Sequence, residues 1–506
     1  MSPGGWRDLG GAGLERGLRS AGRSLALMPR QIFDVIILLL GAMVMIYLFI
    51  YRAPYYAVGF VVVLFAVLFL MRQPVNLSYA LFALIPVYWM NLLGQSLRVV
   101  TVLTLIGFTY HLGRAVLRRQ RGLYNTVYLG FLLYLITCLF SLFNSASIAE
   151  ESWPGIKYFL LALMLMFVLT ASLKTERDLR ILFWILLLWG LVESVLGLLQ
   201  TLVSPRFYLA QTYLSIIDAY SVGGVRRASG TFQIGPRYAM YLMGPLALVV
   251  AGLFSGRILS RRTWLLFLVP LVGGVFVSLT RIAVGLSFAY LVLFNFFERR
   301  RKALIASLAG LLLAAVVVAT VLVVLPADVK GAFMQRFTEK DDEIYTDRLY
   351  FLWNALGAFS EHPFLGIGVG TYEGRSWEFM QKYPLPWRQY RWDVAAQWSM
   401  PETVPVHNEY GRMLAEQGLF SLPVFLFLLW AAFRNLWFVI HETQRPLVRL
   451  WGVAVAMYLS AMVVYWYFHE YFMEEPYTSI MPFALSVILY NFVRREVAER
   501  ASGETS

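Results

Sequence analysis

The run ILFWILLLWGLVESVLGLLQTLV, residues 181 to 203, contains a single charged side chain, that of Glu193. An α-helix needs about 20 apolar residues to cross the hydrocarbon core of a bilayer. A helix also satisfies its backbone N–H and C=O groups internally, which the absence of water in that core requires. The run therefore predicts a transmembrane helix. Glu193 inside it indicates bundle packing or a polar cavity.

Apolar runs of 17 to 23 residues recur along the chain of 506 residues, which is 59% hydrophobic and 14% charged, with a mean hydropathy of +0.64. We predict an all-α polytopic membrane protein with about 14 transmembrane helices (12 to 14). The predicted spans lie near residues 32–50, 55–71, 77–94, 98–113, 124–143, 157–173, 181–203, 237–254, 264–280, 281–297, 303–325, 419–440, 449–468 and 477–493.

Basic residues predict the orientation of these helices. Arginines precede the first span, and basic clusters occupy alternate short loops, so the positive-inside rule places both termini in the cytoplasm. The net charge of +13 then fits contact with anionic lipid rather than nucleic acid. The predicted parts are a cytoplasmic tail (1–31), helices 1 to 11 with a periplasmic loop at 204–236 (32–325), a large helical periplasmic loop (326–411), helices 12 to 14 (412–493) and a cytoplasmic tail (494–506).

Several arginines depart from this charge rule, because they fall on the predicted outer side. Arg226, Arg227 and Arg237 surround the sequence Ala228-Ser229-Gly230-Thr231-Phe232 in or beside the first outer loop. Arg281 lies at the outer turn between two spans, and Arg348 lies in the large loop. An arginine at such a turn either snorkels to water or meets an anion, and the residue alone leaves both interpretations open.

His407, in Val404-Pro405-Val406-His407-Asn408-Glu409-Tyr410, lies at the end of the large loop and is a candidate general base. His362 and His469 are predicted on the same side. His362 precedes a proline in a turn, which favours a structural role, and His469 lies in a short loop, where a histidine is usually just solvated. A structural role for His407 is also open.

Other site chemistries find little support. Cys138 is the only cysteine, and the five histidines show no metal-ligand spacing, so we expect no dedicated metal site. The alternating glycines of Gly366-Ile367-Gly368-Val369-Gly370 follow neither the GxGxxG nor the P-loop pattern, which argues against nucleotide binding. Aromatic residues between Tyr372 and Trp398 fit an interfacial belt, a surface on which sugars stack, or both.

The order of these elements resembles the O-antigen ligase and polymerase family of membrane glycosyltransferases. The resemblance covers roughly residues 225 to 440. The matching residues are Arg227 to Phe232, Thr280-Arg281, Arg348 with Trp353, His362 to Gly368, His407-Asn408 and Glu416 to Leu419. After Gly230-Thr231-Phe232 the chain continues with Gln233-Ile234-Gly235-Pro236-Arg237, where the family has an asparagine-rich turn, so the division of roles among Arg226, Arg227 and Arg237 is open.

The resemblance implies a GT-C-like enzyme of the bacterial inner membrane with a periplasmic active site. Its donor would be an undecaprenyl-diphosphate-linked glycan, transferred with inversion and without a metal or cofactor. Arginines suit the diphosphate because their planar forks bind its oxygens. Diphosphate-binding residues would be Arg227, Arg281 and Arg348, with Arg226 and Arg237 as further candidates; His407 would be the catalytic base, and Asn408, Glu409 and Glu416 would orient it or the acceptor.

The acceptor distinguishes the activities within the family. A polymerase extends another lipid-linked repeat of O-antigen or exopolysaccharide, a ligase uses lipid A core, and a related group uses protein hydroxyls. The length of the chain and its aromatic, basic loop favour the polymerase, with a chain-length regulator as a further partner. A different class, the lipid-linked glycan flippases and transporters, also has many spans with arginines, but the sequence shows no internal repeat of the kind such proteins often carry.

Overall fold

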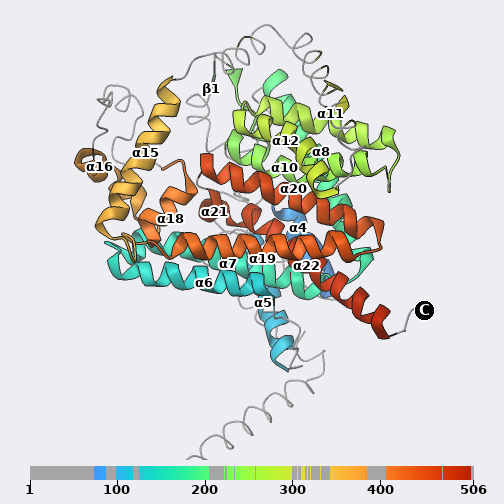
Figure 1. Ribbon diagram of the computed structural model, residues 1–506, viewed down its shortest axis with the longest axis horizontal. Helices are drawn as coiled ribbons and strands as arrows, with labels where there is room; N and C mark the ends of the chain where they lie inside the picture. The colour runs from blue at the N-terminus through green and yellow to red at the C-terminus, as the bar shows by residue number, and fades with distance from the viewer. Residues whose placement is uncertain are drawn as a thin grey trace, which may run out of the picture. The chain divides into compact units, whose positions relative to one another are not determined.

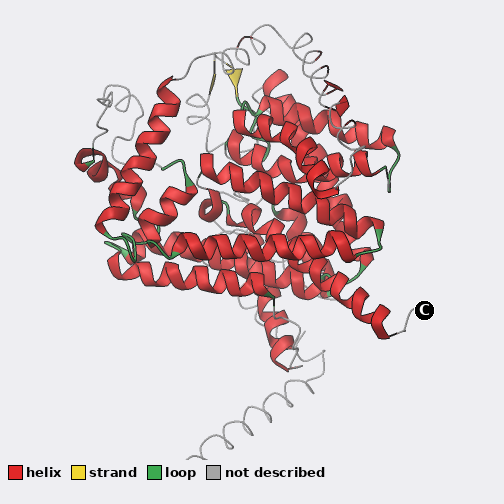
Figure 2. Cartoon of the chain, viewed as in Figure 1, coloured by secondary structure: helices red, strands yellow, loops and turns green. Residues whose placement is uncertain are grey.

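The computed structural model describes residues 73–86, 99–117, 125–203, 221–222, 225–232, 234–256, 258–298, 342–383, 406–469 and 471–502, with isolated positions between 305 and 331. Helices dominate this part of the chain (Figure 2). They are α4 (Pro74–Leu84), α5 (Val99–Leu117), α6 (Thr126–Ser141), α7 (Trp153–Ser172), α8 (Glu176–Leu202), α10 (Gly235–Ser255), α11 (Arg261–Val277), α12 (Arg281–Glu298), α15 (Asp342–Glu361), α16 (Tyr372–Lys382), α18 (Glu409–Gln417), α19 (Ser421–Glu442), α20 (Pro446–Phe468), α21 (Tyr471–Glu474) and α22 (Pro476–Ser502).

The all-α prediction holds for the described residues apart from one strand pair. Strands β1 (Ser221–Val222) and β2 (Val225–Arg226) are antiparallel, with Ser221 opposite Arg226. A 3₁₀ turn (Leu142–Asn144) and a π-helical turn (Ile148–Ser152) connect α6 to α7. This pair of short strands leads directly into the arginine-bearing loop.

Seven helices of the described part are long and apolar enough to cross a membrane, which fits a polytopic membrane protein. They cover Thr126–Asn144, Glu150–Ser172, Glu176–Leu202, Gly235–Ser255, Arg281–Glu298, Ser421–Glu442 and Pro446–Phe468. The predicted spans near 32–50 and 55–71, and most of 303–325, lie outside the described residues. The count of 12 to 14 spans therefore stays a prediction.

Helices α10 and α20 form the centre of the larger of two compact units of the chain, residues 78–105 and 124–506. In the apolar stretch of α10, 83% of the residues are buried, and in that of α20, 78% are. The corresponding fractions for the other five candidate spans are 33% to 50%. Helix α10 packs against α20, α11, α12 and α8, whereas α19 packs against α6, α20 and α22 (Figure 1). The central pair thus offers a rigid frame on which loops at the helix ends are held.

Local sequence explains where the outer helices begin. Thr175 and Asp178 form a reciprocal capping box at the start of α8, and Asn125 caps α6 by accepting a hydrogen bond from the Val127 N–H. Helix α10 ends at Gly256, whose φ of +63° suits glycine. These caps satisfy N–H and C=O groups that a helix terminus otherwise leaves without a partner.

Helices α15 and α16 lie in the segment 326–411, which was predicted as a large helical loop. Tyr372 and Phe379 of α16 stack on one another at 5.9 Å and are 2% and 0% exposed. They form a small core with residues of α15 and α18. Burial excludes these two rings as a surface for sugars, so neither aromatic interpretation holds for them; the aromatic residues from Trp387 to Trp398 lie outside the described residues.

Candidate active site

The loop Arg227 to Phe232 is fixed between α8 and the end of α11. The Ala228 N–H donates to the Val277 carbonyl at 3.0 Å. Glu193 of α8, fully buried, accepts from the Thr231 N–H at 2.9 Å and lies 2.6 Å from the Thr231 hydroxyl. The membrane-span glutamate thus has a packing role that the sequence left open. Arg227, half-buried, enters this loop at its first residue.

The starts of two helices lie beside this loop. Arg281 is the first residue of α12, and Gly235 is the first of α10, with Arg237 in its first turn. A Cβ on Gly235 would lie 3.0 Å from the Ser278 carbonyl oxygen and 3.4 Å from the Arg227 Cβ, so the three chain segments meet here. Helix N-termini carry partial positive charge and attract anions. The junction therefore combines arginines with two positive helix ends.

Arg237 is already paired with an acid. Its Nε lies 2.6 Å from Oε1 of Glu475, and the side chains are 14% and 3% exposed. The guanidinium also lies over the ring of Tyr471, 5.6 Å from its centroid. Both partners come from α21 or the residue directly after it, so Arg237 ties α10 to this short helix.

His407 lies just before α18, in a backbone conformation that is unusual for a residue with a side chain. Its φ is +51°, and its half-buried ring lies 5.8 Å from the ring of Phe351 in α15. The next residue, Asn408, caps α18 through Oδ1, which accepts from the Gly411 N–H at 2.8 Å, and its Nδ2 donates to the Tyr467 carbonyl at 3.0 Å. Asn408 thus fixes the turn that carries His407.

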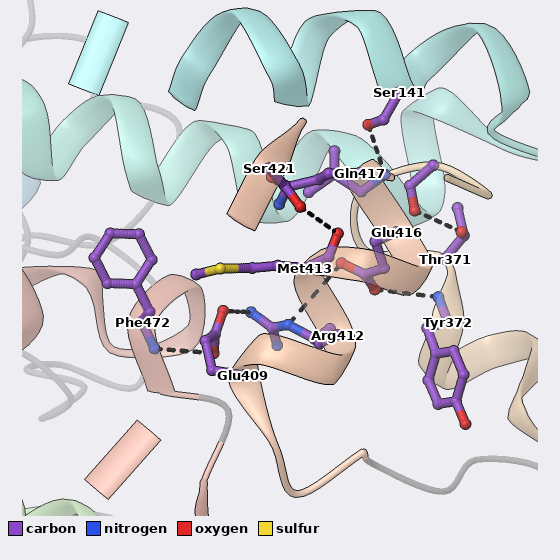
Figure 3. A network of polar contacts seen from close by, with 12 residues as sticks. Ser141, Thr371, Tyr372, Glu409, Arg412, Met413, Glu416, Gln417, Ser421 and Phe472 are labelled. Atoms are coloured by element: carbon purple, nitrogen blue, oxygen red, sulfur yellow. Dashed lines mark hydrogen bonds and ion pairs between the residues drawn. The ribbon is translucent and has the colours of Figure 1, made fainter. Parts of the chain in front are cut away.

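Buried charges hold α18 in place (Figure 3). Arg412 Nη2 donates to Glu409 Oε1 at 3.3 Å, and its Nε lies 3.9 Å from Glu416 Oε2. Glu416 Oε1 accepts from the Tyr372 N–H at 3.2 Å. Burial raises the pKa of Glu416, and the positive charge of Arg412 opposes that rise. Glu409 and Glu416 thus contact Arg412 and backbone, and both are buried.

Helix α21 connects the two halves of the site. The Phe472 N–H donates to Glu409 Oε2 at 3.2 Å, while Tyr471 and Glu475 contact Arg237. The junction of Arg227 with the starts of α10 and α12 is therefore connected to α18, the helix behind His407 in the chain, through five consecutive residues, 471 to 475.

The alternating glycines form a packed turn. Gly366, Gly368 and Gly370 all have positive φ, and the Ile367 and Gly368 N–H groups donate to the Ala415 and Glu416 carbonyls at 2.9 and 3.0 Å. A Cβ on Gly366 would lie 2.2 Å from the Glu416 carbonyl carbon. Close approach to α18 explains Gly366, whereas a Cβ on Gly368 would meet Ser145 and one on Gly370 would meet the Glu151 carbonyl oxygen.

For two of the predicted arginines, Arg226 and Arg348, the structure describes only the backbone. Arg226 is the last residue of β2, one residue before Arg227, and Arg348 lies in the first half of α15. Their side chains lie outside what the structure describes. Their proposed contacts with diphosphate therefore stay predictions.

The structure corrects the interpretation of His469 as a solvated histidine. It is 8% exposed and stacks against Tyr465 at 4.8 Å and Tyr471 at 5.0 Å. Sequence reasoning also missed Arg412, Gln200 and Glu475 as parts of the site. Of the three, only Glu475 could have been noticed in the sequence, because it is an acid next to the last predicted span. Its partner Arg237 lies 238 positions earlier in the chain.

Within the described residues, no group of three or more His, Cys, Asp or Glu side chains could hold a metal ion. The fold and the site define a helical membrane protein that presents arginines at helix N-termini and a histidine on a constrained turn. Residues 265–426, about a third of the chain, match the family model described as O-antigen ligase. This match confirms the predicted resemblance to the O-antigen ligase and polymerase family over that segment. The matched residues include Arg281, Arg348 and His407, whereas Arg227 precedes them. A search of curated proteins found no match.

Proposed function

We propose that this protein is a glycosyltransferase that moves a glycan from undecaprenyl diphosphate to the hydroxyl of an acceptor sugar. The family match supports membrane glycosyl transfer in general. One observation carries the finer proposal: Arg227 and the starts of α10 and α12 meet at one junction, which α21 links to the helix behind His407. An anion-binding junction and a basic imidazole are the two groups that this reaction needs.

The proposed reaction is a single displacement. The acceptor oxygen forms a bond to the anomeric carbon while the bond from that carbon to the diphosphate oxygen breaks, so the configuration inverts. His407 takes the acceptor proton, and undecaprenyl diphosphate leaves with the electron pair. Fixed arginines stabilise the charge that develops on the leaving group, so the mechanism requires neither a metal nor a general acid.

We assign the main diphosphate contacts to Arg227 and Arg281, with Arg348 as a third ligand. Arg237 has a buried acid at 2.6 Å, which compensates its charge, so we give it the role of fixing the start of α10. Arg226 stays the alternative to Arg227. Asn408 and Glu409 are assigned to holding the turn of His407, and Glu416 to holding the glycine turn, rather than to contact with the acceptor.

For the acceptor, we propose the non-reducing end of a second lipid-linked repeat, which makes the protein an O-antigen or exopolysaccharide polymerase. The length and the aromatic, basic composition of the segment that contains α15 and α16 support this acceptor. The ligase activity, with lipid A core as acceptor, is the second candidate, because the matching family model is described as O-antigen ligase.

The proposed location is the bacterial inner membrane, with both termini in the cytoplasm and the site open to the periplasm. The basic short loops support this orientation. The glycan-bearing donor would then enter from the outer leaflet, and a chain-length regulator would act on the same side.

The test is an assay with the purified protein in detergent and a lipid-linked oligosaccharide donor. Lipid-linked repeat and lipid A core are offered as acceptors in separate reactions, and products are measured by mass spectrometry. Elongated lipid-linked chains support the polymerase, and glycosylated core supports the ligase. If the donor is consumed in neither reaction, while the same preparation moves it across vesicle membranes, the proposal is wrong and a transporter is indicated.

A further inference from the structure

The backbone donors of the Arg227 loop are turned toward α8. Gln200 Oε1 accepts from the Ser229 N–H at 3.0 Å and from the Gly230 N–H at 2.9 Å. The next donor, the Thr231 N–H, is bound to Glu193 Oε2 at 2.9 Å. Three consecutive N–H groups, which in other loops form a concave anion site, are thus bound to two side chains of α8.

The loop conformation depends on the same two side chains. Gln200 Nε2 donates to the Gly230 carbonyl at 2.8 Å, so this amide binds the loop through both of its ends. Gly230 has a φ of +57°, and a Cβ there would lie 2.0 Å from Glu193 Oε2. Since any other residue would collide with the carboxylate, Gly230 and Glu193 determine each other's position.

Glu193 and Gln200 lie seven residues apart, which is two helical turns, so they project from one face of α8. Both are almost fully buried, with exposed fractions of 0% and 2%. A carboxyl group and an amide inside a membrane-spanning helix are costly unless they are well bonded. Here their hydrogen bonds go largely to a loop that carries a candidate ligand arginine.

We infer that Glu193 and Gln200 are positioning residues that fix the loop so that the guanidinium of Arg227, rather than the loop's backbone N–H groups, contacts the donor diphosphate. This inference rests on the proposed function. Holding a ligand side chain to within a fraction of an ångström matters because misplacement by about 1 Å can cost on the order of 100-fold in rate.

The test is a double-mutant cycle with purified protein and lipid-linked donor, using Gln200→Ala in the natural background and in Arg227→Lys. Gln200→Ala removes three hydrogen bonds and is expected to lower kcat/KM for the donor by about 10- to 100-fold. If Gln200 acts through Arg227, the same change in Arg227→Lys has a much smaller effect. Equal fold-losses in both backgrounds would overturn the inference.

Two further variants keep the test informative. Glu193→Gln retains an oxygen that accepts from the Thr231 N–H, so it is expected to keep far more activity than Glu193→Ala and to remain testable if Gln200→Ala does not fold. Ser194→Ala is the matched control, because Ser194 is buried on the same helix and bonds to its own Gly190 carbonyl at 2.7 Å. It should leave kcat/KM unchanged.

A further variant, Arg227→Ala, separates this inference from the proposed function. Full activity of Arg227→Ala would contradict the diphosphate clamp itself. Loss of activity in Arg227→Ala together with natural activity in folded Gln200→Ala and Glu193→Ala would leave the clamp intact and refute the positioning role alone.

Discussion

At the scale of single residues, the candidate site contains two non-glycine residues with a positive φ, a conformation that glycine adopts more readily. His407 has a φ of +51° and Leu279, two residues before Arg281, has a φ of +50°. Only Ile258 shares this property among the described non-glycine residues. Such conformations cost about 1 to 3 kcal/mol and persist where the surroundings enforce them, as the Asn408 cap does here.

Replacing His407 should remove the general base. Replacement by glycine should also remove the backbone strain that comes from the positive φ at this position. We expect His407→Ala and His407→Gly each to lower the rate of glycan transfer by about 100- to 10,000-fold, the usual contribution of a general base. His407→Gly should be at least as thermally stable as His407→Ala, because glycine adopts positive φ without strain. Initial rates and melting midpoints in detergent measure both effects, and full activity of His407→Ala would rule out the base assignment.

Arg227 and Arg281 should each be needed for charge stabilisation. Substitution of either by alanine is expected to cost about 2 to 4 kcal/mol in transition-state stabilisation, measured as kcat/KM for the donor. Lysine should recover only part, because it lacks the planar fork. An effect of the same size for Arg434→Ala, whose exposed guanidinium donates to Thr126 far from the junction, would show that loss of charge alone is responsible.

The sequence singles out residues whose type is rare in a membrane protein. It does not reveal contacts between residues that lie far apart in the chain. Arg227, Arg281 and His407 stand out because charged and polar side chains are few among apolar runs. Glu475 gains meaning only from Arg237, and Glu409 was named from the sequence without its partner, the Phe472 N–H, which lies 63 positions away. Contacts over such separations depend on how the helices pack, which local pattern does not specify.

At the scale of elements, we expect the stability of the short helix α18 to depend on one cation, Arg412, whose side chain is 12% exposed. Arg412→Met would leave Glu409 and Glu416 buried without their charge partner, and we expect a loss of about 3 to 5 kcal/mol in stability. The melting midpoint in detergent should fall accordingly. Arg180→Met, in an exposed pair with Glu176, is the control and should change stability by less than about 1 kcal/mol. Equal midpoints for the two variants would contradict this account of α18.

The end of α18 should tolerate no side chain where it meets the residues just before the glycine turn. Gly418 has a φ of +78°, and a Cβ there would lie 2.3 Å from the Phe364 carbonyl oxygen. We expect Gly418→Ala to destabilise the protein by more than about 1 kcal/mol. Gly374→Ala, in the exposed part of α16 with only the end of the Glu151 side chain nearby, should be neutral or slightly stabilising. Thermal melts of both variants test this, and the reverse order would refute it.

At the scale of the whole molecule, the apolar runs predicted the helices well, because the bilayer requires length and hydropathy that composition reveals. The spans predicted near 181–203 and 237–254 correspond to α8 and α10. The four-residue helix α21 was not predicted, since it lies between two spans and has no periodicity of its own. Its importance comes from the Phe472 N–H that reaches Glu409 and from its neighbour Glu475.

Helix α21 also bears on how the donor and the acceptor affect each other's binding. A donor anion bound by Arg227 and Arg281 would also attract the nearby Arg237, and a weakened pair with Glu475 would shift residues 471–475 and with them the Glu409 contact behind His407. By thermodynamic linkage, donor and acceptor would then alter each other's affinity by the same factor, about 5- to 150-fold for a coupling of 1 to 3 kcal/mol. Titrations of acceptor with and without a non-reactive donor analogue measure this factor. Glu475→Gln should bring this factor close to one, so that donor and acceptor bind independently.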